Sequence, residues 1–178
     1  MRYRKDAIAL VAELYKKRTK LPLILERLVE RGFRKRSKES VETLIIKLKK
    51  ERQRENFEKW AKKNPVKYRA MTLVSGAKQR AKKKGIPFDL TVDHIQDILE
   101  EGECQVTGLP FDIQPHQRGR DMTKKAMHAP SLDQIRPSGG YTIDNVQVVV
   151  YNYNTLKSNG TDEEALRTAR ALVVRYGS

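Results

Sequence analysis

The chain has 178 residues, enough for one compact domain or two small ones. Its 37 Lys and Arg residues exceed its 22 Asp and Glu residues, and the formal net charge of +15 is typical of a protein that binds a polyanion such as nucleic acid. No apolar stretch is long enough to cross a bilayer, no secretory signal pattern is visible and Cys104 has no partner for a disulfide, so we expect a cytoplasmic protein with no membrane partner.

The positive charge is distributed unevenly along the chain. Residues 1–64 carry a net charge of +12, whereas residues 65–178 carry only +3. Asn64 and Pro65 interrupt the helical pattern at the same place, because a proline disfavours helical backbone in the residue before it. We therefore predict a basic DNA-binding segment over 1–64 and a second domain over 65–178. The alternative is that the charges only solvate helices.

Apolar residues at helical spacing predict three helices in the basic segment, over about 4–18, from 21 to about 31, and from 38 onward. Ser37 is a suitable N-cap for the third helix. Three short helices with a basic turn before the third resemble a helix-turn-helix domain, in which the third helix enters the major groove of DNA. A helical hairpin used for dimerisation is the alternative.

The helix-turn-helix interpretation assigns DNA contacts to the turn and to the third helix. The residues expected to bind phosphates are Arg34, Lys35, Arg36 and Lys38. The polar residues off the apolar stripe, which could face bases, are Ser40, Glu42, Thr43 and Lys47. Because each neutralised phosphate releases counterions, such binding should weaken steeply with salt.

The middle of the chain predicts a helix over 68–84, an extended segment over 86–90 and a helix capped by Thr91. His94 falls in that helix, where a lone histidine is more often a packing or surface residue than a ligand. Residues Thr107 and Gly108 indicate a tight turn. With one cysteine in the chain, a structural zinc site is not expected.

The segment from 129 to 157 predicts a strand over 131–135, a glycine-containing loop over 137–141, a β-branched strand over 146–150 and a helix over 152–157. A last helix over 162–175 is capped by Thr161. The expected fold class is α+β, mostly helical, with a small β-hairpin.

This strand–loop–strand–helix order, together with the pattern Ser-Leu-Asp-x-Ile, Gly-Tyr, Asn-Val and Asn-x-x-Lys, resembles the ββα-metal core of the HNH endonucleases, and in particular a phage-associated subgroup. The resemblance covers about 104–159 and extends loosely back to about 68. It implies that Asp133 and Asn154 bind Mg2+ or Mn2+ and that Asn145 holds the loop and orients the catalytic base. Taken singly, each of these three residues could instead be a hydrogen-bonding residue at a strand end, turn or helix start.

The chain departs from the family pattern at one position. Gln134 stands where most members have the histidine that activates water, and glutamine cannot accept the proton. His128 or His116 could supply the base, water could react without a protein base, or the domain could bind DNA without cutting it. Arg136 and Lys157 flank the expected site and could hold phosphates or be surface charges.

These observations predict a metal-dependent endonuclease that hydrolyses phosphodiester bonds of DNA. One alternative is a resolvase that uses the same site on branched or junction DNA. Another is a DNA-binding regulator with a degenerate nuclease fold. The expected partner is double-stranded or branched DNA, and a homodimer is possible because cleavage of both strands at one place normally needs two sites.

Overall fold

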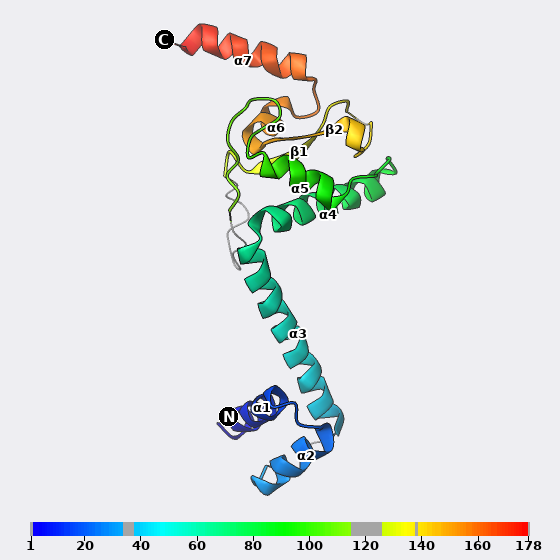
Figure 1. Ribbon diagram of the computed structural model, residues 1–178, viewed down its shortest axis with the longest axis vertical. Coiled ribbons are helices and arrows are strands. Elements are labelled where there is room, and N and C mark those ends of the chain that lie inside the picture. Colours follow the sequence, from blue (N-terminus) through cyan, green and yellow to red (C-terminus); the bar gives the residue numbers. More distant parts are fainter. Residues whose placement is uncertain (1, 34–37, 115–125, 138, 178) are drawn as a thin grey trace. The chain divides into compact units, whose positions relative to one another are not determined.

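The computed structural model describes residues 2–33, 38–114, 126–137 and 139–177. The elements in chain order are α1 (Arg2–Lys16), α2 (Leu21–Glu30), α3 (Lys38–Lys63), α4 (Pro65–Lys84), α5 (Val92–Glu100), β1 (Pro130–Gln134), β2 (Val146–Val150), α6 (Tyr151–Lys157) and α7 (Asp162–Tyr176), with a 3₁₀ turn over Ile143–Asn145 before β2. Figure 1 shows a mostly helical chain with one small antiparallel sheet, so the predicted α+β class is confirmed.

The chain divides into two compact units, residues 1–59 and 60–178. The predicted boundary was between residues 64 and 65, where α3 ends and α4 begins. The observed division falls a few residues earlier, inside α3, because the last turn of that helix contributes the fully buried Ala61 to the second unit. None of the described helices is both long and apolar enough to span a membrane.

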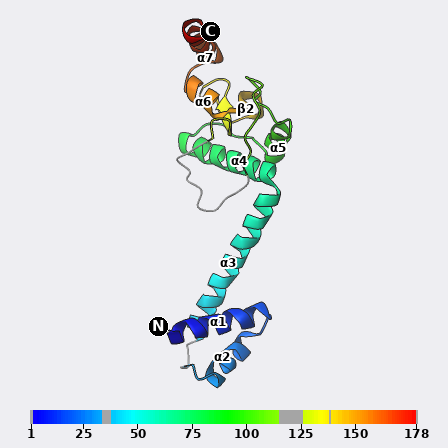
Figure 2. The same ribbon diagram turned by 90° about the vertical axis from the view of Figure 1, so that its left-hand side faces the viewer.

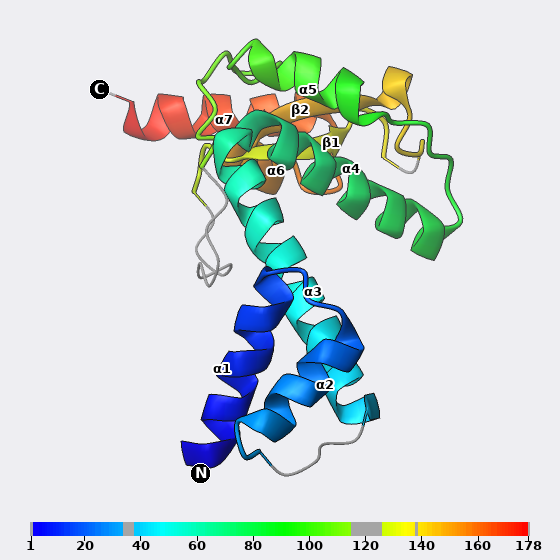
Figure 3. The ribbon, with the colours of Figure 1, turned by 60° about the horizontal axis from the view of Figure 1, so that its bottom comes forward.

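In the first unit, α1, α2 and the first turns of α3 pack around one apolar core (Figure 3). Its fully buried side chains are Ala7, Val11, Ile24, Leu28 and Val41. Each helix supplies apolar residues three or four positions apart, which places them on one face of the helix. The three predicted helices are therefore present, and DNA recognition by α3 stays a prediction.

The second unit is built around the β1–β2 hairpin. The strands pair antiparallel, with Asp133 opposite Gln147 and Leu132 opposite Val148. Leu132 and Val148 belong to the apolar core formed with α4 and α5. The polar side chains at the positions between them in the strands point to the opposite face of the hairpin, where α6 lies. Figures 1 and 2 show the hairpin lying between α4 and α5 on one side and α6 on the other.

The loop between the strands is attached to the segment that follows α4. The Tyr141 backbone N–H donates to the carbonyl of Pro87 at 2.9 Å, and the Ile143 N–H donates to a carboxylate oxygen of Asp89 at 2.8 Å. Gly140 allows this close approach, since its φ is +92° and an added Cβ would lie 2.8 Å from the Pro87 carbonyl oxygen. The extended segment predicted over 86–90 thus has a role in holding the hairpin loop.

Replacement of Gly140 by alanine should destabilise the second unit more than replacement of Gly85. Both residues have positive φ, but a Cβ at Gly85 would meet no atom within 4 Å, whereas one at Gly140 would collide with backbone. Gly85→Ala should cost about 1–2 kcal/mol for the left-handed backbone alone, and Gly140→Ala should cost clearly more. Denaturant unfolding of the two variants measures the difference. Equal losses would show that the loop can move away from Pro87.

Candidate functional site

A polar pocket of about 310 Å³ lies along β1 in the second unit. Four consecutive residues of β1 line it, which places the pocket at the strand edge that β2 leaves unpaired. Its walls come from α4, from α6 and from the residues after α6. The polar and charged residues of the lining are Arg80, Lys84, Ser131, Asp133, Gln134, Tyr141, Tyr151, Asn154, Ser158 and Asn159. Two cations and several hydrogen-bonding groups therefore face one strand edge that carries a carboxylate.

Asp133 is buried, with 4% of its surface exposed, and one of its oxygens is already engaged. Oδ2 accepts hydrogen bonds from Lys157 Nζ at 2.7 Å and from Gln147 Nε2 at 2.8 Å. Within the described part of the chain, no donor contacts the other oxygen, Oδ1. Asp133 is thus a buried carboxylate with one oxygen held by the protein and one available to the pocket.

Lys157 lies at the centre of a buried ion network. Its Nζ donates to Asp133, to Asp162 Oδ1 at 2.8 Å and to the backbone carbonyl of Gln134 at 3.1 Å. These three acceptors match the three N–H bonds of an ammonium group. Asp162 also accepts a hydrogen bond from the Tyr153 hydroxyl at 2.5 Å. The network ties β1 and α6 to the first residue of α7.

The buried network shifts the pKa values of its members. Burial by itself would lower the pKa of the Lys157 ammonium, but the hydrogen bonds and charges of Asp133 and Asp162 outweigh burial and raise it. Burial would raise the pKa of the Asp162 carboxyl, but hydrogen bonds from Lys157 and Tyr153 outweigh it and lower that pKa. Burial and the carboxylate of Asp162 raise the pKa of Tyr153. All three groups keep their ordinary charge states at neutral pH.

The assignment of Lys157 as a phosphate contact is wrong, because only 4% of the residue is exposed and its donors are all used within the protein. Arg136 is exposed at the start of the hairpin loop, so its assignment as a DNA contact stays a prediction.

Asn154 lines the same pocket as Asp133. Its Nδ2 donates to Ser131 Oγ at 2.7 Å and to the Leu132 carbonyl at 3.2 Å. A carbonyl only accepts, so the nitrogen must face β1, and the amide oxygen lies on the opposite side of the group. No donor among the residues described reaches that oxygen.

The pocket thus offers two oxygens without protein donors, Asp133 Oδ1 and Asn154 Oδ1. Such a pair suits Mg2+, which is commonly bound through one or two protein oxygens with water and phosphate completing its coordination. Across the described ranges, no three His, Cys, Asp or Glu side chains gather as a metal-binding group. A cation here would rely on one carboxylate, one amide and its other ligands.

Gln134 lines the pocket at the end of β1, and its Nε2 is buried without a partner in the part of the chain that is described. His128 lies before the beginning of β1, and it is not among the pocket residues. Asp133 is three residues, about 10 Å, beyond the beginning of β1 at Pro130, and His128 lies in the turn that precedes the strand. His128 is therefore not placed as a base for this pocket, and His116 falls outside the described residues.

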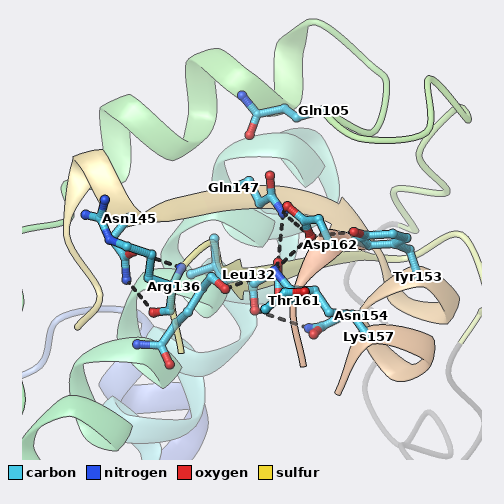
Figure 4. Close-up of polar contacts among 12 residues, drawn as sticks. Gln105, Leu132, Arg136, Asn145, Gln147, Tyr153, Asn154, Lys157, Thr161 and Asp162 are labelled. Atoms are coloured by element: carbon cyan, nitrogen blue, oxygen red, sulfur yellow. Dashed lines mark hydrogen bonds and ion pairs between the residues drawn. The ribbon is translucent and has the colours of Figure 1, made fainter. Parts of the chain in front are cut away.

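Asn145 is buried and connects both ends of the loop between the strands. Its Oδ1 accepts from the Arg136 backbone N–H at 3.0 Å. Its Nδ2 donates to the carbonyls of Arg136 and Gly140 at 3.1 and 2.9 Å. Figure 4 shows Asn145 beside Arg136, away from Asn154 and Lys157. The side chain holds the loop and contacts no group of the pocket's carboxylate network.

The residues predicted to contact DNA in the first unit lie partly outside the described ranges. Arg34, Lys35 and Arg36 fall there, as does the predicted cap Ser37. Lys38 begins α3 and is 3.9 Å from Glu42, an exposed pair. Thr43 and Lys47 are exposed on the same face of α3, off the stripe that packs into the core.

The sequence interpretation did not single out Arg80 and Lys84. They are four residues apart on α4, so they lie on one face of the helix, and both line the pocket. The Arg80 Nε donates to the Tyr141 hydroxyl at 2.8 Å, which steadies the guanidinium and leaves its other N–H groups for a ligand. Only their spacing in a lysine-rich helix could have marked them, and their neighbours share that feature.

Comparison with known proteins gives little about function. The chain is 31% identical over 97 residues to a protein of Enterobacteria phage T4 described as an uncharacterized 29.0 kDa protein in the dda-modA intergenic region. That similarity covers 54% of this chain and 35% of the phage protein, so the chain spans about a third of its relative. No family model and no solved structure matches.

Replacement of Lys157 by methionine should destabilise the second unit by about 3–5 kcal/mol at neutral pH, because it leaves the buried Asp133 carboxylate and the partly exposed Asp162 carboxylate without their cation. The stability that Asp162 contributes through its lowered pKa is present above the ordinary pKa of 3.8 and is lost as the pH falls through the lowered pKa. The stability that Lys157 contributes through its raised pKa is present below the ordinary pKa of 10.5 and is lost as the pH rises through the raised pKa. The destabilisation caused by Lys157→Met should therefore become smaller in acid. The free energy of unfolding can be measured between pH 3 and 10, with the exposed Lys84→Met variant as control. Equal losses of stability in the two variants would contradict the prediction.

Proposed function

We propose that the chain is a metal-dependent DNA endonuclease of the HNH type, with its reaction centre in the pocket along β1. The observation that carries this proposal is the pair of unengaged oxygens of Asp133 and Asn154 in a pocket whose other wall holds Arg80 and Lys84. A nuclease needs carboxylate and amide oxygens for a cation and donors for phosphate at the same place. The order β1, β2 and α6 agrees with the ββα-metal resemblance of the sequence.

The residues have separate tasks in this proposal. Asp133 and Asn154 would hold Mg2+ or Mn2+, which when bound supplies charge stabilisation for the phosphate and the leaving oxygen. Lys157 and Gln147 orient the Asp133 carboxylate through Oδ2. Arg80 and Lys84 bind the phosphate oxygens of the strand to be cut. Thr43, Lys47 and the basic residues that precede α3 in sequence supply further contacts to duplex DNA.

A second candidate function is DNA binding without cleavage. Gln134 has no titratable group, and among the pocket residues of the described chain there is no histidine. General-base catalysis typically contributes about 10²–10⁴-fold to rate, so its absence favours either slow cleavage or a regulator with a degenerate site. The same basic surfaces would serve both functions.

Supercoiled plasmid incubated with the protein and Mg2+ should be nicked slowly, and EDTA should stop the reaction. Asn154→Ala and Asp133→Asn should abolish nicking while circular dichroism shows that the fold remains. Gln134→His should raise the rate by about 10²–10⁴-fold, because an imidazole would stand at the end of β1 beside the proposed metal ligands. His128→Ala is the matched control and should leave the rate unchanged.

Plasmid that stays intact with the wild type and with Gln134→His would favour the regulator. Supercoiled plasmid tests duplex cleavage, and a four-way junction tests the resolvase alternative. A strong preference for the junction would identify branched DNA as the substrate.

Arg80→Ala and Lys84→Ala should weaken DNA binding and cleavage, because each removes a cation that faces the pocket. The slope of log affinity against log salt should fall by about one for each lost phosphate contact. Lys78→Ala and Lys83→Ala are matched controls on the same helix whose side chains do not line the pocket. Fluorescence anisotropy with a labelled duplex measures the slopes. Equal effects at all four positions would mean that α4 acts only as a general basic surface.

A further inference from the structure

Helix α7 leaves much of its apolar face uncovered. Ala165 is buried against the rest of the unit, but Leu166 and Leu172 are each 50% exposed and Val173 is 66% exposed. Figures 1 and 2 show the end of α7 reaching away from α6 and the sheet. Single exposed apolar residues are ordinary, whereas a contiguous apolar face on one helix indicates a surface that is covered by a partner.

An apolar groove continues this face onto the body of the unit. It has a volume of about 520 Å³ and runs between α7, α6 and the turn near residue 107. The apolar side chains of its lining include Val106, Leu109, Tyr153, Leu156, Leu166 and Ala169. Leu156 and Val106 are themselves 42% and 40% exposed. The groove can therefore receive side chains of a second amphipathic helix.

The charges on α7 indicate which kind of helix can pack against it. The chain carries +15, yet α7 holds three acids and three arginines and is neutral. Its acids all lie in the first turn, Asp162, Glu163 and Glu164, and its last turn holds Arg175. An antiparallel copy of α7 would place an acidic turn beside a basic one at each end of the pair. Two copies of this basic protein can meet here without the repulsion expected of their other surfaces.

We propose that α7 and the groove beside it form a self-association surface, on which the α7 helices of two copies pack antiparallel. The end of one α7, with Leu172 and Val173, covers Leu166 and the groove of the other copy. In such a contact the same surface of each chain meets its counterpart on the other, which gives a closed twofold dimer. Ala169, at the middle of α7, lies near the twofold axis. The proposal does not require catalysis in the pocket along β1, although Asp162 both lines the groove and holds Lys157.

Sedimentation equilibrium at moderate salt tests the proposal on the full chain. The wild type should change from the mass of one chain to that of two as its concentration rises. Leu172→Asp should weaken association by about tenfold or more, because it places a charge in the apolar contact. Val174→Asp is the matched control, since Val174 is 86% exposed, lies on the outer side of α7 and gains the same charge. A monomer at every concentration, or equal effects of the two variants, would overturn the proposal.

Cysteine cross-linking tests the antiparallel direction. A mixture of Leu166→Cys and Leu172→Cys chains should form a disulfide dimer faster than either variant alone, since the two positions meet only between antiparallel helices. Cys104 is buried and should not compete. Faster cross-linking of each variant with itself would require a parallel pair, and the antiparallel model would then be wrong. Arg167→Cys, on the outer side of α7, should cross-link slowly in every case.

Discussion

The ammonium of Lys157 organises the second unit. It is held by Asp133 of β1, Asp162 of α7 and the carbonyl of Gln134, so one buried cation of α6 joins the first strand of the hairpin to the two helices that follow the hairpin. A buried ion pair of this kind seldom adds much net stability relative to apolar packing, but loss of one partner leaves an uncompensated charge and is costly. The network therefore acts mainly to specify the geometry of the site. It holds Oδ2 of the Asp133 carboxylate, and Asp133 lines the pocket.

The geometry of the pocket follows from the small size of the sheet. Among the described residues the sheet has two strands, so one edge of β1 has no partner strand there, and helices α4 and α6 border that edge. An unpaired edge usually requires protection, and here basic and polar side chains line it. In the proposed function, this unpaired edge would be the place where the charged backbone of DNA approaches the Asp133 carboxylate.

The proposed dimer would add a functional geometry that one chain lacks. A nuclease with one pocket cuts one strand at a time, whereas a twofold pair presents two pockets related by the symmetry that duplex DNA itself approximates. The neutral charge of α7 separates the surface for self-association from the surfaces for nucleic acid. Both kinds of contact could therefore form at once.

Local pattern determined much of the fold. The helices, β2 with its run of valines and the Thr161 cap follow from apolar spacing and capping chemistry, which act within a few residues. The sequence also placed Asp133, Gln134 and Asn154 in one segment, and the structure puts all three along one pocket. Asn145 was expected to hold the loop, and its three hydrogen bonds lie within that loop.

Only the tertiary structure decided which charges are buried and which groups share the pocket. Lys157 reads as a surface cation in sequence, and it is buried because Asp133 and Asp162 surround it in space. Arg80 and Lys84 look like their neighbours on α4 until the helix is packed beside β1. His128 is close to the site in sequence, but it lies in the turn before β1 and does not line the pocket. Periodicity describes which face of an element is apolar, and it contains no information on which elements meet.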